Sequence, residues 1–140
     1  MNKRFLIFLI TVLSLSTLLA ACQAQPTPVY VQGEERDLVA AGAAPFAEHI
    51  LKGIETNDYS LFTTDFDDAM LKALTETQFA TIVKSYGSLG AAQKSEVINI
   101  EAKDSFYRVN YKVTYAEKIV LMLIVLPKEE PRKVSGLWFN

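Results

Sequence analysis

The sequence predicts an α+β domain in which N-terminal helices pack on a curved antiparallel β-sheet. In residues 46–86, apolar side chains recur at every third or fourth position, as on one face of a helix. In residues 95–139 they alternate with polar side chains or run without a break, as in strands. Because the helical segments precede the strands and the strand connections are short, we expect separate helices and an antiparallel meander.

The first helices are predicted from their apolar spacing and their starting residues. Phe46, Ile50 and Ile54 recur every fourth residue, and Pro45 suits the first turn of the helix that they form. Asp58 and Asp67 each precede a short apolar segment and are expected to cap two short helices through their side chains.

A longer helix follows these two short ones. Residues 75–78 read Thr-Glu-Thr-Gln, which matches a capping box at a helix start. Phe79, Ile82 and Tyr86 then fall on one face of the helix. Gly87 is expected to end it as a left-handed cap.

Four strands are predicted in the second half, at residues 95–102, 107–115, 119–126 and 134–139. The second alternates strictly, with Tyr107, Tyr111 and Tyr115 on one face and polar residues on the other. Residues 127–131 form a turn, and Gly136 is expected to mark a bulge or bend.

The third strand is apolar throughout residues 119–126, so we expect both of its faces to be covered. Helices can cover one face of the sheet. The other face would then be closed by curvature around a pocket or by a second subunit.

The domain resembles the nuclear-transport-factor-2-like folds, and within them a bacterial domain family of unknown function. The residues that carry this resemblance lie in five segments: residues 54–59, Phe62 with residues 65–66, residues 75–87, residues 89–90 and residues 134–139. The match covers roughly residues 46–140. The resemblance implies a helix-lined cone with an apolar cavity, often dimeric through the sheet, and it implies no particular activity.

The N-terminal segment reads as an export signal. Lys3 and Arg4 precede an apolar run, and the chain's single cysteine, Cys22, follows Ala20 and Ala21. This arrangement resembles the lipobox of a bacterial lipoprotein, which implies cleavage between Ala21 and Cys22 and acylation of Cys22. We therefore expect a protein that is lipid-anchored on the extracytoplasmic face of the cell membrane or the outer membrane. A membrane-spanning helix and a plain secretory signal are the alternatives.

Three parts of the chain follow from this interpretation. Residues 1–21 are the signal peptide, residues 22–37 are the lipidated cysteine with a flexible tether, and residues 38–140 are one domain. Pro26 and Pro28 favour extended backbone in the tether. Fully extended, such a tether would reach on the order of 50 Å.

Composition excludes several classes of function. The net charge is −2 and basic residues are scattered, so nucleic acid is not expected as a partner. One cysteine and one histidine, His49, do not make a metal site, and we expect no cofactor. The acidic residues 65–68 do not begin a calcium loop, because Ala69 and Met70 stand where an oxygen ligand and a glycine are needed. His49 is expected to be a surface or boundary residue.

The remaining candidates are residues that could line a pocket: Tyr107, Tyr111, Tyr115, Met122 and Trp138. We expect a non-enzymatic module that binds a small apolar ligand, a peptide or a protein, whose identity the sequence does not give. One alternative is an enzyme, of the ketosteroid-isomerase type or another isomerase or hydrolase, with Asp65 or Glu101 as a buried base near a tyrosine. The other is a structural domain that forms a homodimer through the sheet.

Overall fold

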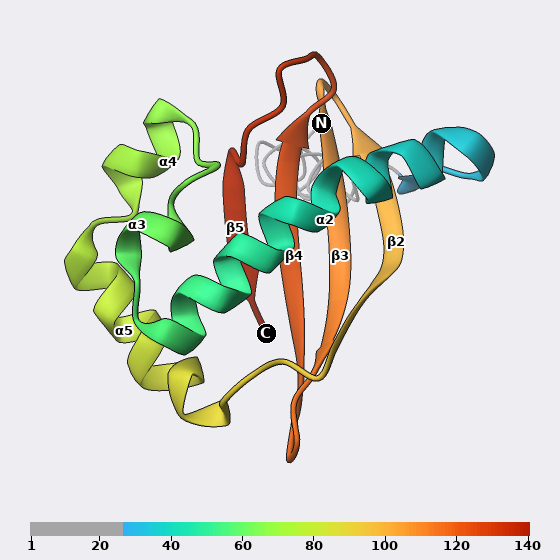
Figure 1. Ribbon diagram of the computed structural model, residues 1–140. Coiled ribbons are helices and arrows are strands. Elements are labelled where there is room, and N and C mark those ends of the chain that lie inside the picture. Colours follow the sequence, from blue (N-terminus) through green and yellow to red (C-terminus); the bar gives the residue numbers. More distant parts are fainter. Residues whose placement is uncertain (1–26) are drawn as a thin grey trace, which may run out of the picture.

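The computed structural model describes residues 27–140, and Cys22 and the predicted signal peptide lie outside this range. The described chain is an α+β domain with an open five-stranded antiparallel sheet in the order β1-β2-β3-β4-β5 (Figure 1). None of the helices within residues 27–140 has the length and apolarity needed to cross a bilayer.

The sheet is a meander in which each strand pairs with the next one along the chain. Its strands are β1 (Val29–Tyr30), β2 (Lys94–Lys103), β3 (Phe106–Thr114), β4 (Ile119–Pro127) and β5 (Gly136–Phe139). The four strands predicted from the sequence are confirmed. The alternation in β3 buries Tyr107 and Tyr111 as expected, and Tyr115, the residue after the strand, is buried as well. Val125 faces Gly136 in the register and also accepts a hydrogen bond from the N–H of Ser135, which is the two-against-one pattern of a β-bulge.

One long helix, α2 (Gly33–Thr56), crosses one face of the sheet, while α3 (Tyr59–Phe62), α4 (Asp68–Ala73) and α5 (Glu76–Tyr86) gather beside β5 (Figure 1). The predicted caps are confirmed. Asp58 accepts from the N–H of Leu61 at 3.0 Å, and Asp67 accepts from that of Met70 at 2.7 Å. The capping box at Thr75 is also present: the backbone N–H of Thr75 donates to the Gln78 side chain at 2.7 Å.

The core lies between α2 and the inner face of the sheet. The buried residues of α2 recur every three or four positions, ending with the adjacent pair Gly53 and Ile54, so they form one stripe along the helix. They are Val39, Ala43, Ala47, Ile50, Gly53 and Ile54. The inner face of β3 and β4 supplies the opposite side. Its fully buried members include Val109, Val113, Met122 and Ile124. The Phe62 ring packs edge-on against Phe66 and at a tilt against Phe79, and this aromatic cluster joins α3 and α5 to the core.

The domain begins earlier than the sequence predicts. Val29 and Tyr30 pair with β2, and the N–H of the buried Val31 donates to Ile100 at 2.8 Å. Helix α2 starts at Gly33, so residues 29–37 belong to the domain and the boundary expected at residue 38 is wrong. Pro45 lies inside α2, twelve residues after its start, and is exposed.

The end of α5 also differs from the expectation. Gly87 has right-handed helical backbone angles and continues into a 3₁₀ turn, η1 (Gly87–Leu89). The left-handed position falls on Gly90, whose φ is +75°. The glycine that permits the change of direction is therefore three residues later than predicted.

The outward face of β4 is not covered by the rest of residues 27–140. Ile119 and Leu121 are 54% and 47% exposed, although their neighbours Val120 and Met122 are buried. The expectation that both faces of β4 are covered is therefore wrong for the single chain, because α2 covers the inner face alone.

Gly53 fixes the contact between α2 and α3, and its replacement should be costly. A Cβ at Gly53 would lie 2.6 Å from the backbone nitrogen of Phe62, a distance that requires the two helices to move apart. We expect Gly53→Ala to lower the free energy of unfolding by about 2 kcal/mol, measured by urea denaturation. The matched control is Gly42→Ala in the same helix, where a Cβ meets nothing closer than 3.9 Å. That variant should gain about 0.5–1 kcal/mol from helix propensity, and equal losses in both variants would contradict the prediction.

Candidate functional site

The row of tyrosines on β3 belongs to the core. Tyr107, Tyr111 and Tyr115 all point to the inner face and are at most 7% exposed. Met122 is fully buried beside them on β4, whereas Trp138 is half-exposed on the opposite face of the sheet. The five residues predicted to line one pocket therefore lie on two faces, and the four inner ones pack in the core.

Tyr111 is the most deeply buried of the three tyrosines. Within residues 27–140 its hydroxyl has no hydrogen-bond partner. Burial raises the pKa of Tyr111 to about 12 because the phenolate would be poorly solvated in the core. Burial also raises the pKa of Tyr115, with smaller contributions from the Tyr86 and Glu55 charges.

Tyr107 has a carboxylate partner that the sequence did not predict. Its hydroxyl donates to Glu35 of α2 at 2.6 Å. This hydrogen bond, together with burial and the Glu35 charge, raises the pKa of Tyr107 even though Arg132 acts in the opposite direction. The guanidinium of Arg132 lies 5.5 Å from the Tyr107 ring centre. Glu35 was missed because its segment was assigned to the tether and because it lies 72 residues before Tyr107 in the sequence.

The two carboxylates predicted as possible bases have other partners. Asp65 lies 2.7 Å from Nδ1 of His49, and both side chains are partly exposed. Glu101 pairs with Arg108 at 3.3 Å on the outward face of the sheet. His49 is a boundary residue as predicted, but it has an orienting partner that was not foreseen. Among the described residues, no group of three or more His, Cys, Asp or Glu is placed to hold a metal ion.

Asp67 connects α4 with the segment before β5. Burial raises the pKa of Asp67, but hydrogen bonds from the Met70 N–H, the Ser135 side chain and the Ala69 N–H, with the Lys133 charge, together hold that pKa below its ordinary value. A backbone hydrogen bond joins the same two segments, since the N–H of Asp67 donates to the carbonyl of Val134 at 3.0 Å.

A groove lies between helices α4 and α5 and strand β5, and we call it the edge groove. Its volume is about 440 Å³, and its apolar lining includes Met70, Leu74, Ile82 and Leu137. Ala73 and Thr81 lie on its helical side and Trp138 on its strand side.

The edge of β5 that faces this groove has free backbone groups. In the ladder with β4, Trp138 is opposite Leu123, and Asn140 exchanges both backbone hydrogen bonds with Leu121. The alternation of an antiparallel ladder then points the N–H and C=O of Leu137 and Phe139 away from β4. Within residues 27–140 these groups have no hydrogen-bond partner outside the ladder.

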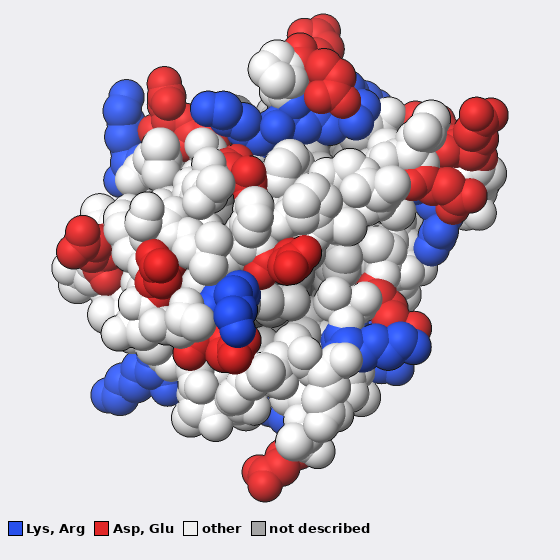
Figure 2. All heavy atoms as spheres, viewed as in Figure 1, with Lys and Arg blue, Asp and Glu red and all other residues white. Residues whose placement is uncertain are grey.

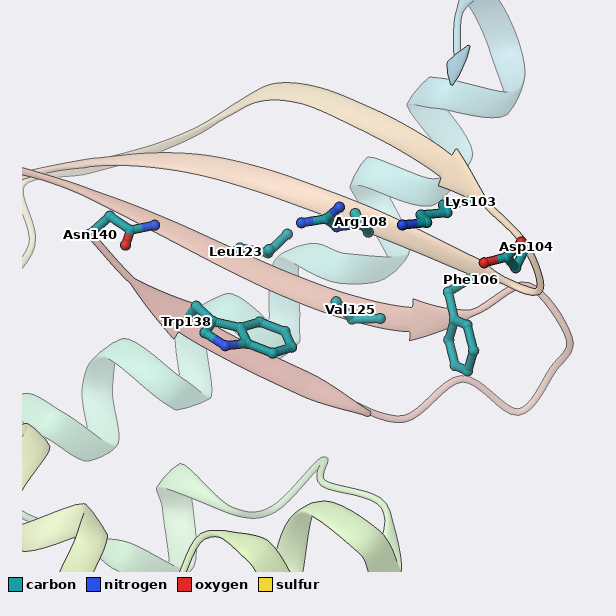
Figure 3. A pocket seen from close by; sticks show the side chains of 8 residues that line it. All are labelled: Lys103, Asp104, Phe106, Arg108, Leu123, Val125, Trp138 and Asn140. Carbon is teal, nitrogen blue, oxygen red and sulfur yellow. The ribbon is translucent and has the colours of Figure 1, made fainter. Parts of the chain in front are cut away.

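A second groove lies on the outward face of the sheet, and we call it the outer groove. Its volume is about 420 Å³, with Leu123, Val125 and Trp138 on the strands and Phe106 near the β2–β3 turn (Figure 3). Arg108 and Lys103 lie along its β2–β3 side (Figure 3).

Trp138 keeps its position because Gly136 has no side chain. A Cβ at Gly136 would lie 2.6 Å from the Trp138 ring, so the ring occupies the space above the glycine. On the helix-covered side of the molecule, acidic and basic side chains are interspersed, and neither sign forms a large patch (Figure 2).

Tyr111→Phe should stabilise the domain, because it removes a buried hydroxyl that has no partner. We expect a gain of about 1 kcal/mol in the free energy of unfolding at neutral pH. The raised pKa means that the neutral phenol is favoured in the folded state. Stability is therefore present below the ordinary pKa near 10 and is lost as pH rises toward about 12. The variant should lose less stability than wild type across that window.

Tyr107→Phe is the matched control, since it removes a hydroxyl that has a partner at 2.6 Å. We expect it to cost about 1 kcal/mol. The free energy of unfolding of both variants is measured by urea denaturation at pH 7, 9 and 11. A loss of stability in Tyr111→Phe at pH 7 would contradict the view that the Tyr111 hydroxyl is buried without a partner.

Comparisons with known proteins identify no relative. No family model, no curated protein and no solved structure matches the chain. The resemblance to nuclear-transport-factor-2-like folds and the lipoprotein signal therefore stay predictions.

Proposed function

We propose that this chain is a lipid-anchored protein of the bacterial cell envelope, and that its domain is a non-enzymatic module that binds an extended apolar peptide. The peptide would lie in the edge groove, alongside β5. The observation that carries the proposal is the free backbone edge of Leu137 and Phe139 beside an apolar groove of about 440 Å³.

The chemistry of the edge favours a peptide backbone as the ligand. Free N–H and C=O groups at Leu137 and Phe139 match those of an added strand, and alternate side chains of that strand would enter the groove. Natural edge strands are usually protected by charged residues or proline, and β5 reads Gly-Leu-Trp-Phe. The apolar lining favours uncharged ligand side chains.

The segment just before β5 already pairs with another part of the chain along the same edge. Phe66 forms a parallel bridge with Val134, and the N–H of Val134 donates to Asp65 at 2.8 Å. A bound peptide would extend the same kind of pairing from Val134 along β5.

The positions of the carboxylates favour binding over catalysis. Tyr111 and Tyr115 lie in the core, and the predicted bases Asp65 and Glu101 pair with His49 and Arg108 instead. Glu35 does reach Tyr107, but it lies exposed on α2, where a water-excluded site for a general base is not formed.

The anchor rests on the N-terminal sequence. Cys22 is the only cysteine in the chain and follows an apolar segment with basic residues before it. We retain the nuclear-transport-factor-2-like interpretation as part of the proposal. The order of helices α2 to α5 before strands β2 to β5 is compatible with it.

Acylation of Cys22 can be tested directly by intact-mass spectrometry of the protein purified from membranes of an expressing bacterium. We expect a chain that begins at Cys22 and carries a diacylglyceryl group, because the signal would be removed after Ala21. Cys22→Ala should remain unprocessed and fail to incorporate a labelled fatty acid, whereas Ala24→Ser should behave as wild type. A mature chain with an unmodified Cys22 thiol would exclude the anchor.

Peptide binding can be tested with the membrane-purified protein in nanodiscs and a fluorescein-labelled heptapeptide of alternating threonine and valine. We expect Ala73→Arg to weaken binding about tenfold or more, because a charged side chain would enter the apolar groove. Ala80→Arg is the matched control, since Ala80 is equally exposed on α5 but does not line the groove.

A second control changes the ligand. Replacing the central valine by proline removes a backbone donor, so the substituted peptide should bind more weakly. Fluorescence anisotropy measures each case. Equal binding by Ala73→Arg and wild type, or by both peptides, would contradict pairing along β5.

A further inference from the structure

The outward face of the sheet changes from polar to apolar across its width. The outward side chains of β2 and β3 are mostly polar, and those of β4 are Ile119, Leu121, Leu123 and Val125. Trp138 continues the apolar part onto β5 and is 54% exposed. We call the outward residues of β4 with Trp138 the apolar stripe.

The route of the chain brings the anchor to this face. Val29 pairs with Ala102 and Tyr30 with Glu101, so the chain enters β1 from the Lys103 end of β2. Lys103 lines the outer groove. Cys22 precedes Val29 by seven residues, which span about 23 Å at most when fully extended.

The corrected domain boundary therefore shortens the tether to less than half of the reach predicted from the sequence. A lipid on Cys22 would hold the β2–β3 end of the sheet close to the bilayer surface. A covalent tether this short gives the bilayer a high effective concentration at the apolar stripe of every anchored copy.

The charge of the outward face also fits a lipid surface. Outward positions of β2 and β3 carry four basic residues against two acidic ones, Glu96 and Glu101. The basic ones are Lys94, Lys103, Arg108 and Lys112. The whole chain, in contrast, has a net charge of −2. Basic residues beside an exposed apolar surface match anionic headgroups above an acyl region.

We propose that the outward face of the sheet docks on the lipid bilayer that carries the anchor. The apolar stripe enters the boundary between headgroups and acyl chains, with Trp138 at headgroup depth. Lys112 on β3 and Lys103 on β2 meet the phosphates. This inference rests on the proposed acylation of Cys22.

The single tryptophan of the chain reports the docking directly. We would reconstitute the membrane-purified protein, one copy per disc, in nanodiscs of phosphatidylcholine and phosphatidylglycerol, with or without bromine on the acyl chains. The same preparation is checked by intact-mass spectrometry for the lipid on Cys22. We expect bromine to quench the Trp138 fluorescence and the emission to be blue-shifted relative to the delipidated protein in buffer.

Two matched substitutions test which surface is responsible. Leu121→Glu places an acid in the apolar stripe and should weaken the quenching about twofold or more, since a carboxylate resists transfer out of water. Leu38→Glu makes the same change at an exposed leucine of α2 and should leave the quenching unchanged. Circular dichroism confirms that both variants are folded.

The outcomes separate the two proposals. An acylated protein whose Trp138 is not quenched would overturn the docking and leave the anchor intact. A free Cys22 thiol would overturn the anchor, and the docking with it. The measurement is repeated in discs that hold two copies. A blue shift without quenching that appears only there would show that a second copy covers the stripe and would also overturn the docking.

Discussion

The stripe of small and branched residues along α2 is the contact on which the rest of the structure depends. The buried side chains of this stripe, including Ala43 and Ala47, form one core with the inner-face residues of β3 and β4. A single layer of helices can cover a single face. The helices all pack against this one core, so they do not cover the outward face or pair with the edge of β5. Both surfaces remain available for other partners.

Patterns local in sequence were predictable, and pairings distant in sequence were not. The alternation of β3 and the caps at Asp58 and Asp67 depend on neighbouring residues, so they could be predicted. The first strand could not, because two exposed residues such as Val29 and Tyr30 have no periodicity. Proline and charged residues in the same region resembled a linker, and they hid the early start of α2.

The candidate sites show the same division. Two side-chain pairs join residues that are distant in sequence: Glu35 with Tyr107, and His49 with Asp65. No local sequence motif predicts either pair. The unbroken apolar run of β4 was predicted correctly as a strand, but a sequence does not state how many layers the chain itself can supply. Trp138 lines both grooves, so a ligand in the edge groove and a surface on the outward face would meet at one indole ring.

The attachment of β1 has a mechanical consequence. A force applied to the chain before Val29 is carried first by the two-residue pairing with β2 and by the hydrogen bond from Val31 to Ile100. These few bonds can separate one after another while α2 and the other four strands stay folded. The start of the domain would then act as an extensible segment that lengthens under load and shortens again when the load is removed.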